Sequence, residues 1–238
     1  MIDFKEVLFL CVVTLANIME GITGFAGTML AMPLSMILLG VQPAKSILNI
    51  VAIIVSSLIF FSTYKDINKK ELFKIVVFMV IGMGGGIYLF SVFPASGLAK
   101  IYGVLIILIS LKGLFIKKEF RLSNVALTFV VLIAGIIHGM FLSGGALLII
   151  YAVSVLKDKY TIRATLAPVW MILNSYILLQ DLYVGNITPQ VSRLIIYSII
   201  PLLLAVALGN YLHKKMNQKF FIKLTYFLLI ISGITLLF

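Results

Sequence analysis

Charged residues are scarce in this chain of 238 residues. Only 11% of its residues are charged, whereas 62% are hydrophobic and the mean hydropathy is +1.19. Soluble globular domains carry about 25% charged and about 45–50% apolar residues. The composition therefore excludes a soluble enzyme, a nucleic-acid-binding module and a disordered chain, and it indicates a protein of the lipid bilayer.

Cysteine and histidine are scarce as well. Cys11 is the single cysteine, which excludes a disulfide within the chain and any metal site built from several cysteines. His138 and His213 are the two histidines, and this small number argues against a bis-histidine haem or a multi-histidine metal centre. We therefore expect neither a metal nor a cofactor.

Long apolar runs are abundant, and they predict an all-α, multi-pass membrane protein. In lipid the backbone polar groups must be satisfied within the spanning structure, and these runs are too long and alternate too little for barrel strands. No small-residue cleavage site is evident before Gly21, so we expect the first run to be retained. Ten segments are expected: Val7–Glu20, Thr28–Gly40, Ser46–Tyr64, Leu72–Phe93, Ala95–Phe115, Asn124–Leu142, Ala146–Leu156, Ala164–Tyr183, Val191–Leu212 and Phe220–Phe238. A crossing helix needs about 20 residues, so six or seven of these segments can span, whereas the first, second and seventh are short.

Glycine-rich breaks flank the short segments and recur in the two halves of the chain. One break covers Gly21 to Gly27, and the other is Ser143-Gly-Gly145. An offset of 118 residues pairs Gly21 with Gly139, Gly27 with Gly145, and Lys45 with Arg163; an offset of 123 pairs Gly86 with Gly209. We therefore predict two repeats of five segments, residues 1–116 and 124–238, joined by a basic linker at 117–123. Short broken helices or re-entrant hairpins are expected at the start of each repeat.

Basic residues outnumber acidic ones by 19 to 8, which gives a net charge of +11. In a membrane protein such an excess reports topology rather than nucleic-acid binding. The loops that follow odd-numbered segments hold 15 of the 19 basic residues, so we place these loops in the cytoplasm and both termini outside the plasma membrane. The second repeat is then inverted relative to the first. If the two segments that flank each glycine break formed one broken span instead, the two sides of the membrane would hold 10 and 9 basic residues. This division has no bias toward either side, so we reject that arrangement. Ten crossings, and six crossings with two re-entrant hairpins, stay open.

Each half also carries a glycine cluster followed by a helix that begins with small residues. The stretches are Gly24-Phe-Ala-Gly-Thr-Met-Leu-Ala-Met-Pro33 with Gln42-Pro-Ala-Lys-Ser46, and Gly135-Ile-Ile-His-Gly139 with Ser143-Gly-Gly145 and Arg163-Ala164. In these stretches, and in size and duplication, the whole chain resembles the sulfite exporter TauE/SafE family, also called the 4-toluene sulfonate uptake permease family. The resemblance implies a transporter of small anions such as sulfite, sulfonates and related carboxylates.

The glycine breaks are the first candidates for binding such an anion. Backbone N–H groups at a helix start, together with the helix dipole, can hold an anion, although small residues also let membrane helices pack closely. We favour anion binding for Gly24, Gly27, Gly144 and Gly145, with hydroxyl groups from Thr28 and Ser143. For the run Gly82-Met-Gly-Gly-Gly86 and for Gly103 we favour helix packing.

Other polar residues of the apolar segments are further candidates. Lys45 and Arg163 could neutralise the anion or extend to the lipid headgroups. Asn49 and Asn174 could line a polar cavity or join helices. We expect Trp170 to face lipid or the membrane interface.

Two ionisable residues lie beside the breaks. Glu20 and His138 are equivalent at the 118-residue offset. An ionisable group within a span is costly, and a histidine titrates near neutral pH, so both are candidates for carrying a coupled proton. A water-facing carboxylate and a hydrogen-bonded packing histidine are the alternatives.

These observations together predict a secondary transporter that exports a small anion by alternating access. Inverted repeats with interrupted helices are a recurring plan of such transporters, and we expect the anion to bind between the two breaks. A passive anion channel is the main alternative. A membrane-embedded enzyme would need an acid–base or metal cluster, which the short basic loops do not offer. The expected partners are the anion, the bilayer and protons as a candidate coupling ion, without nucleic acid, and a homo-oligomer stays open.

Overall fold

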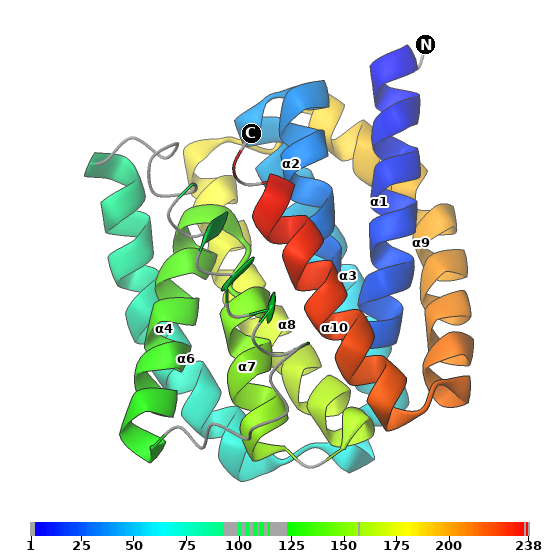
Figure 1. Cartoon of the computed structure of the whole chain (residues 1–238). Coiled ribbons are helices and arrows are strands. Elements are labelled where there is room, and N and C mark those ends of the chain that lie inside the picture. Colours follow the sequence, from blue (N-terminus) through cyan, green and yellow to red (C-terminus); the bar gives the residue numbers. More distant parts are fainter. Residues whose placement is uncertain are drawn as a thin grey trace. The chain divides into compact units, whose positions relative to one another are not determined.

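Helices make up almost all of the described chain (Figure 1). The structure is a computed structural model that describes residues 3–92, 123–156 and 158–235, Leu237 and a few positions between 100 and 114. The helices are α1 (Phe4–Thr23), α2 (Gly27–Leu39), α3 (Val41–Thr63), α4 (Lys69–Val92), α6 (Asn124–Phe141), α7 (Gly145–Val155), α8 (Lys159–Val184), α9 (Pro189–Lys215) and α10 (Gln218–Thr235), with a 3₁₀ turn η1 (Tyr64–Asp66). They coincide with nine of the ten expected segments. The remaining one, Ala95–Phe115, lies mainly outside the described residues.

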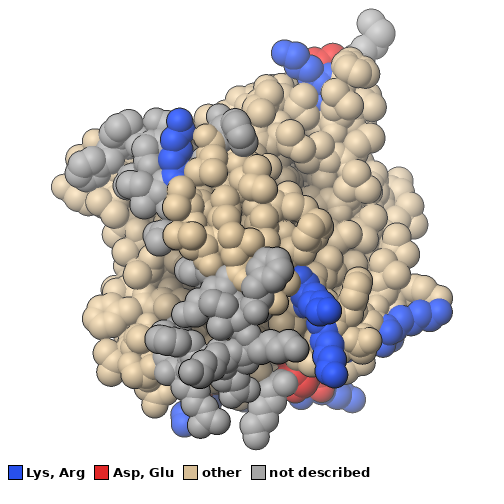
Figure 2. Space-filling model, viewed as in Figure 1, with Lys and Arg blue, Asp and Glu red and all other residues tan. Residues whose placement is uncertain are grey.

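Seven helices of the described chain are long and apolar enough to cross a membrane, namely α1, α3, α4, α6, α8, α9 and α10. Their outward surfaces carry large apolar side chains, such as Phe61, Phe73 and Ile200, which are about three-quarters exposed at 72%, 74% and 70%. On the face drawn in Figure 2, few of the described residues are charged. The prediction of an all-α, multi-pass membrane protein is confirmed.

The first helix is longer than predicted, and the expectation that its segment is short is wrong. At its start, the Asp3 carboxylate accepts a hydrogen bond from the Glu6 N–H at 2.8 Å and the Glu6 carboxylate faces the Asp3 N–H at 3.4 Å, which forms a capping box. At its end, Gly21 continues the helix instead of breaking it. A Cβ atom on Gly21 would lie 3.0 Å from the Cα of Gly209, so this glycine permits the close approach of α1 to α9.

The helices form two compact units, and each unit takes helices from both halves of the sequence. The first unit comprises Met1–Leu72 and Arg163–Lys215, and therefore holds α1, α2, α3, α9 and most of α8. The second comprises Phe73–Ile162 and Met216–Phe238, and holds most of α4 together with α6, α7 and α10.

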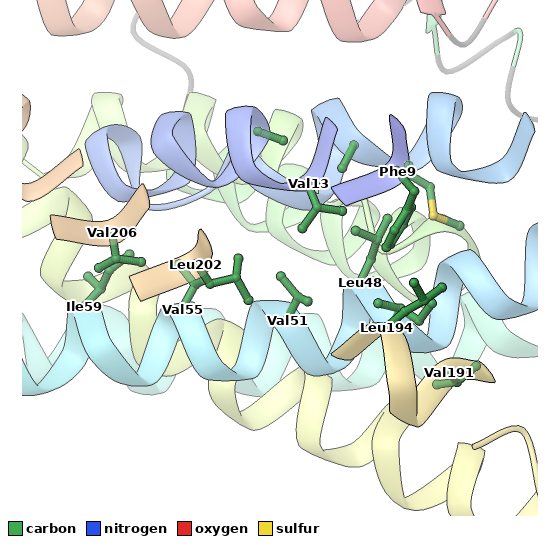
Figure 3. Close-up of a cluster of buried hydrophobic side chains, with 14 of the residues drawn as sticks. Phe9, Val13, Leu48, Val51, Val55, Ile59, Val191, Leu194, Leu202 and Val206 are labelled. Carbon is green, nitrogen blue, oxygen red and sulfur yellow. The ribbon is translucent and has the colours of Figure 1, made fainter. Parts of the chain in front are cut away.

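The core of the first unit lies between α1, α3 and α9 (Figure 3). Phe9 and Val13 of α1 meet an apolar row on α3 and another on α9. The row on α3 is Leu48, Val51, Val55 and Ile59, and the row on α9 is Val191, Leu194, Leu202 and Val206. Lipid is as apolar as these side chains, so close van der Waals packing rather than the hydrophobic effect holds the three helices together.

Glycines bring α4 and α6 together in the second unit. A Cβ atom on Gly82 would lie 2.1 Å from the carbonyl oxygen of Leu132, and one on Gly86 would lie 2.0 Å from that of Ile136. The predicted packing role is therefore confirmed for both glycines, but it is wrong for Gly84 and Gly85, because a Cβ atom at either position would have nothing within 4 Å. Gly103 also takes part in packing, because its carbonyl oxygen would lie 2.9 Å from a Cβ atom on Gly233.

Candidate functional site

The two helix breaks have the same backbone conformation at equivalent positions. The first unit's α1 ends at Gly24, which has a left-handed φ of 83° and donates its N–H to the Glu20 carbonyl at 2.7 Å. In the second unit, α6 ends at Leu142, which has a φ of 55° and donates to the His138 carbonyl at 2.9 Å. The next helices begin at Gly27 and Gly145. Each pair is separated by the 118-residue offset. The first break is thus shorter than the predicted Gly21–Gly27.

The start of α2 is occupied by a carboxylate of the chain itself. Glu20 is buried, and its Oε2 accepts a hydrogen bond from the Gly27 N–H at 2.7 Å. The Thr28 N–H also bonds to this carboxylate. Free N–H groups and the helix dipole favour a negative charge at this place. The predicted anion-binding backbone therefore holds the side chain of Glu20.

Arg163 lies beside this carboxylate in the first unit. Its guanidinium is buried, interacts electrostatically with Glu20, and donates from Nη2 to Oδ1 of Asn210 on α9. A Cβ atom on Gly24 would lie 3.0 Å from the Arg163 Cγ, so this glycine admits the arginine stem to the break. The Arg163 Nε has no hydrogen-bond partner. The break thus places a cation with spare donor capacity beside an anion.

The side chains of Trp170 and His213 contact backbone carbonyl groups at the end of α1. The Trp170 Nε1–H donates to the Gly24 carbonyl at 2.7 Å, and the His213 Nδ1 lies 2.7 Å from the Ile22 carbonyl oxygen. Carbonyl groups at the end of a helix lack partners within it, which explains these contacts. Trp170 is only 5% exposed, so the expectation that it faces lipid or the interface is wrong.

The second break carries different side chains on the same backbone. His138 stands at the position equivalent to Glu20 and is buried. The Ser143 hydroxyl donates to the Phe141 carbonyl at 3.0 Å, within the turn. A Cβ atom on Gly144 would lie 2.3 Å from the Ala134 carbonyl oxygen, so Gly144 is required by the contact with α6. Gly145 begins α7.

Lys45 lies far from Arg163 within the first unit. Lys45 is half-buried and interacts electrostatically with Asp181 of α8. The Asp181 Oδ1 also accepts hydrogen bonds from Gln42 at 3.2 Å and Asn186 at 2.8 Å. Asp181 follows Arg163 by 18 residues, which is about 27 Å of helix at 1.5 Å per residue. The structure therefore does not bring the two predicted cations together.

Asn49 and Asn174 form a polar contact between α3 and α8. The Asn49 Nδ2 donates to the Asn174 carbonyl at 3.1 Å, and both residues are buried. The Asn49 Oδ1 and the nearby Ser56 hydroxyl lack hydrogen-bond partners. Asn174 lies about 16 Å along α8 from Arg163. Of the predicted site residues in the first unit, only Glu20, Gly24, Gly27, Thr28 and Arg163 gather at the break.

Sequence reasoning missed three residues of this cluster, namely Trp170, Asn210 and His213. The available signal was the polarity of Asn210 and His213 within a predominantly apolar segment. No group of three or more histidine, cysteine or acidic side chains in the described ranges could hold a metal ion.

Comparison with known proteins identifies the family of the chain. A comparison with curated proteins finds no match, and neither does a comparison with solved structures. The family model described as "Sulfite exporter TauE/SafE" matches residues 9–236. This match spans both helix breaks and all nine described helices but for the first residues of α1. The chain therefore belongs to the sulfite exporter TauE/SafE family.

Proposed function

We propose that the protein is a secondary transporter that exports sulfite, a sulfonate or a related small organic anion by alternating access. One observation carries this proposal beyond the family. Arg163 is a buried cation on a spanning helix, only 3% exposed, at the point where α1 is interrupted. A charge within a span is costly, and interrupted helices mark the binding sites of many transporters.

The chemistry of Arg163 fits an oxyanion. The guanidinium is planar, stays charged and presents its N–H groups as a fork that matches two oxygens of a carboxylate-like or sulfonate-like group. Its Nη2 contacts the neutral Asn210, while its Nε has no hydrogen-bond partner. These donors and the N–H groups of Gly27 and Thr28 would together surround a small anion.

Two features support inverted repeats as the basis of alternation. The breaks share their left-handed residue and their helix start at a constant offset of 118. In addition, α1 crosses α9 at Gly21 and Gly209, while α6 crosses α4 at Gly139 and Gly86. Each crossing joins the first helix of one repeat to the fourth helix of the other, as a duplicated and exchanged pair would.

A flux assay tests the proposed function. Protein in proteoliposomes should accelerate counterflow of sulfite or methanesulfonate, and the flux should saturate with concentration. Arg163→Gln should lose this flux although the protein still inserts and elutes as a single species. Arg193→Gln is the matched control, because Gln190 remains to hydrogen-bond Glu6 at 3.3 Å. Flux that does not saturate would identify a channel, and no flux of either anion would contradict the proposal.

The proposed orientation has its own test. With Cys11→Ser as a cysteine-free background, Asn186→Cys should react with an impermeant external thiol reagent, and Lys69→Cys should be protected in intact cells. The reverse pattern would place both termini inside.

A further inference from the structure

The proposed anion site is already filled by an anion that belongs to the chain. The Glu20 carboxylate accepts hydrogen bonds from the Gly27 N–H, at 2.7 Å, and from the Thr28 N–H, and it interacts electrostatically with Arg163. These are the donors and the cation that a transported anion would use. Glu20 is 3% exposed, so its charge is balanced within the protein rather than by water.

A second anion cannot join Glu20 at this place without a large electrostatic cost. Two like charges about 4 Å apart repel by about 4 kcal/mol even at an effective dielectric constant of 20. Among the described residues, Arg163 is the cation that interacts with Glu20 at the break and could balance them. A substrate anion must therefore replace the charge of Glu20 rather than add to it.

Building on the function proposed above, we infer that Glu20 is a tethered competitor of the transported anion. In the empty carrier its carboxylate caps α2 and neutralises Arg163. When Glu20 takes up a proton, its charge disappears, its hold on the N–H groups weakens, and the substrate takes its place. Proton uptake and anion binding are thereby obligatorily linked.

The balance of charge and protons follows from this exchange. The carboxylate takes one proton from the water to which the site is open, and it returns that proton to the water on the side where the anion leaves. No covalent bond other than the carboxyl O–H forms or breaks. One proton therefore moves in the same direction as each anion, and transport of a monovalent anion carries no net charge.

The elements packed around Glu20 contribute several charged and titratable groups. The element α8 contributes Arg163, which stays protonated throughout the physiological range. From α9 come Asn210, whose amide does not titrate, and His213, whose Nδ1 lies against the Ile22 carbonyl oxygen. The element α2 has no titratable side chain, and the Lys45 of α3 interacts with Asp181.

A static electrostatic interaction between Glu20 and Arg163 is the competing explanation for the same geometry. A buried pair fixes a conformation and is destabilising when one partner is removed. In that case Glu20 would affect folding without affecting the dependence of flux on pH. The two explanations therefore differ in a transport property rather than in stability.

Wild-type protein provides the first measurement. Proteoliposomes that contain a pH-sensitive dye are loaded with methanesulfonate, a strong-acid anion whose charge does not change with pH, or with sulfite. With methanesulfonate, one proton should accompany each anion, and a clamped membrane potential should not alter the flux. Above the pKa of Glu20 the apparent affinity should fall about tenfold per pH unit, as the protonated fraction does.

The variant Glu20→Gln provides the second measurement. Its neutral amide cannot compete as a charge, so anion counterflow should persist at alkaline pH with an apparent affinity at least about tenfold tighter than that of the wild type. Net transport should no longer move protons. Glu6→Gln is the matched control, since Glu6 is buried on the same helix but is paired with Arg193. This control should keep the wild-type pH profile. The same holds with sulfite, because the protonation of sulfite itself affects the wild type and both variants equally.

The outcomes separate this inference from the function on which it rests. No flux of either anion by the wild type would overturn the proposed transport function. Flux without proton movement, or a Glu20→Gln variant that is folded and has the wild-type pH profile, would overturn the competitor role alone. Loss of counterflow in folded Glu20→Gln would overturn it as well. If Glu20→Gln does not fold, the proton count of the wild type decides.

Discussion

The helix breaks of the two units differ in the side chain that faces the start of the second helix. At the first break, Glu20 places a negative charge on the N–H groups of α2. At the second, the equivalent residue is His138, whose imidazole is neutral or cationic. The two breaks thus share a left-handed turn but differ in charge, which shows that an equivalent backbone does not imply equal chemistry.

The residue that ends the first helix also differs between the breaks. Gly24 has a φ of 83°, which glycine adopts without strain, whereas Leu142 has a φ of 55°, which costs a side-chain-bearing residue about 1 kcal/mol. The glycine lies against the stem of Arg163. Leu142 is instead buried, at 1% exposed. The glycine of the first break therefore leaves space for the Arg163 side chain, whereas the leucine of the second break adds a buried apolar side chain.

The largest expected effect comes from filling the space at the first break. In Gly27→Leu, the new Cβ atom would lie 2.2 Å from the Glu20 Oε2, so the carboxylate and any anion that replaces it lose their place. We expect flux to fall about a hundredfold, equivalent to about 2.7 kcal/mol, as measured by counterflow in proteoliposomes. Gly85→Leu is the control, because nothing lies within 4 Å of its Cβ position. Wild-type flux in inserted Gly27→Leu would remove the anion site from the first break.

The helix crossings offer a second comparison of the two units. A Cβ atom on Gly86 would lie 2.0 Å from the Ile136 carbonyl oxygen, whereas one on Gly21 would lie 3.0 Å from the Gly209 Cα. Overpacking costs about 1–3 kcal/mol, so we expect Gly86→Ala to be near the top of this range and Gly21→Ala near the bottom. Unfolding in detergent measures both.

A control at the same helix sharpens that comparison. Nothing lies within 4 Å of the Gly84 Cβ position, so Gly84→Ala should stabilise α4 by about 0.5–1 kcal/mol through the lower backbone entropy of alanine. Equal destabilisation by Gly84→Ala and Gly86→Ala would show that the crossing does not require a glycine on the side of α4 that contacts α6.

Much of the fold follows from apolar runs and glycines. The length of each run determines the helices, and the offset of 118 residues anticipates the equivalent turns at Gly24 and Leu142. The boundaries of α1 could not be predicted because they depend on two contacts, the capping box at Asp3 and the crossing at Gly209. The grouping of helices from both halves of the sequence within each unit could not be predicted either, since it depends on packing between distant segments.

The candidate site was predicted in its residue types but not in its arrangement. Charges in apolar segments are conspicuous, so Glu20 and Arg163 were found individually. Their interaction joins α1 to α8 across more than half of the chain, and no local pattern indicates it. Lys45 looks equivalent to Arg163 in the sequence, but Lys45 interacts with Asp181. Asp181 has no acidic counterpart in the first half of the chain, because the 118-residue offset pairs it with Thr63.

The residues that end α1 and α6 allow a further comparison of the two breaks. Gly24→Ala should destabilise the protein by about 1–2 kcal/mol, the cost of a left-handed alanine, and should also lower flux because the new Cβ atom lies 3.0 Å from the Arg163 Cγ. Leu142→Gly relieves about 1 kcal/mol of strain but removes a buried side chain, which costs about 2–5 kcal/mol in leucine-to-alanine changes, so we expect a net loss of stability of about 1–4 kcal/mol. Its flux per folded molecule should stay within about twofold of the wild type, since no charged group of the described residues is placed by Leu142. Thermal unfolding and counterflow on the same preparations separate stability from flux, and equal losses of flux in the two variants would show that the breaks contribute alike to transport.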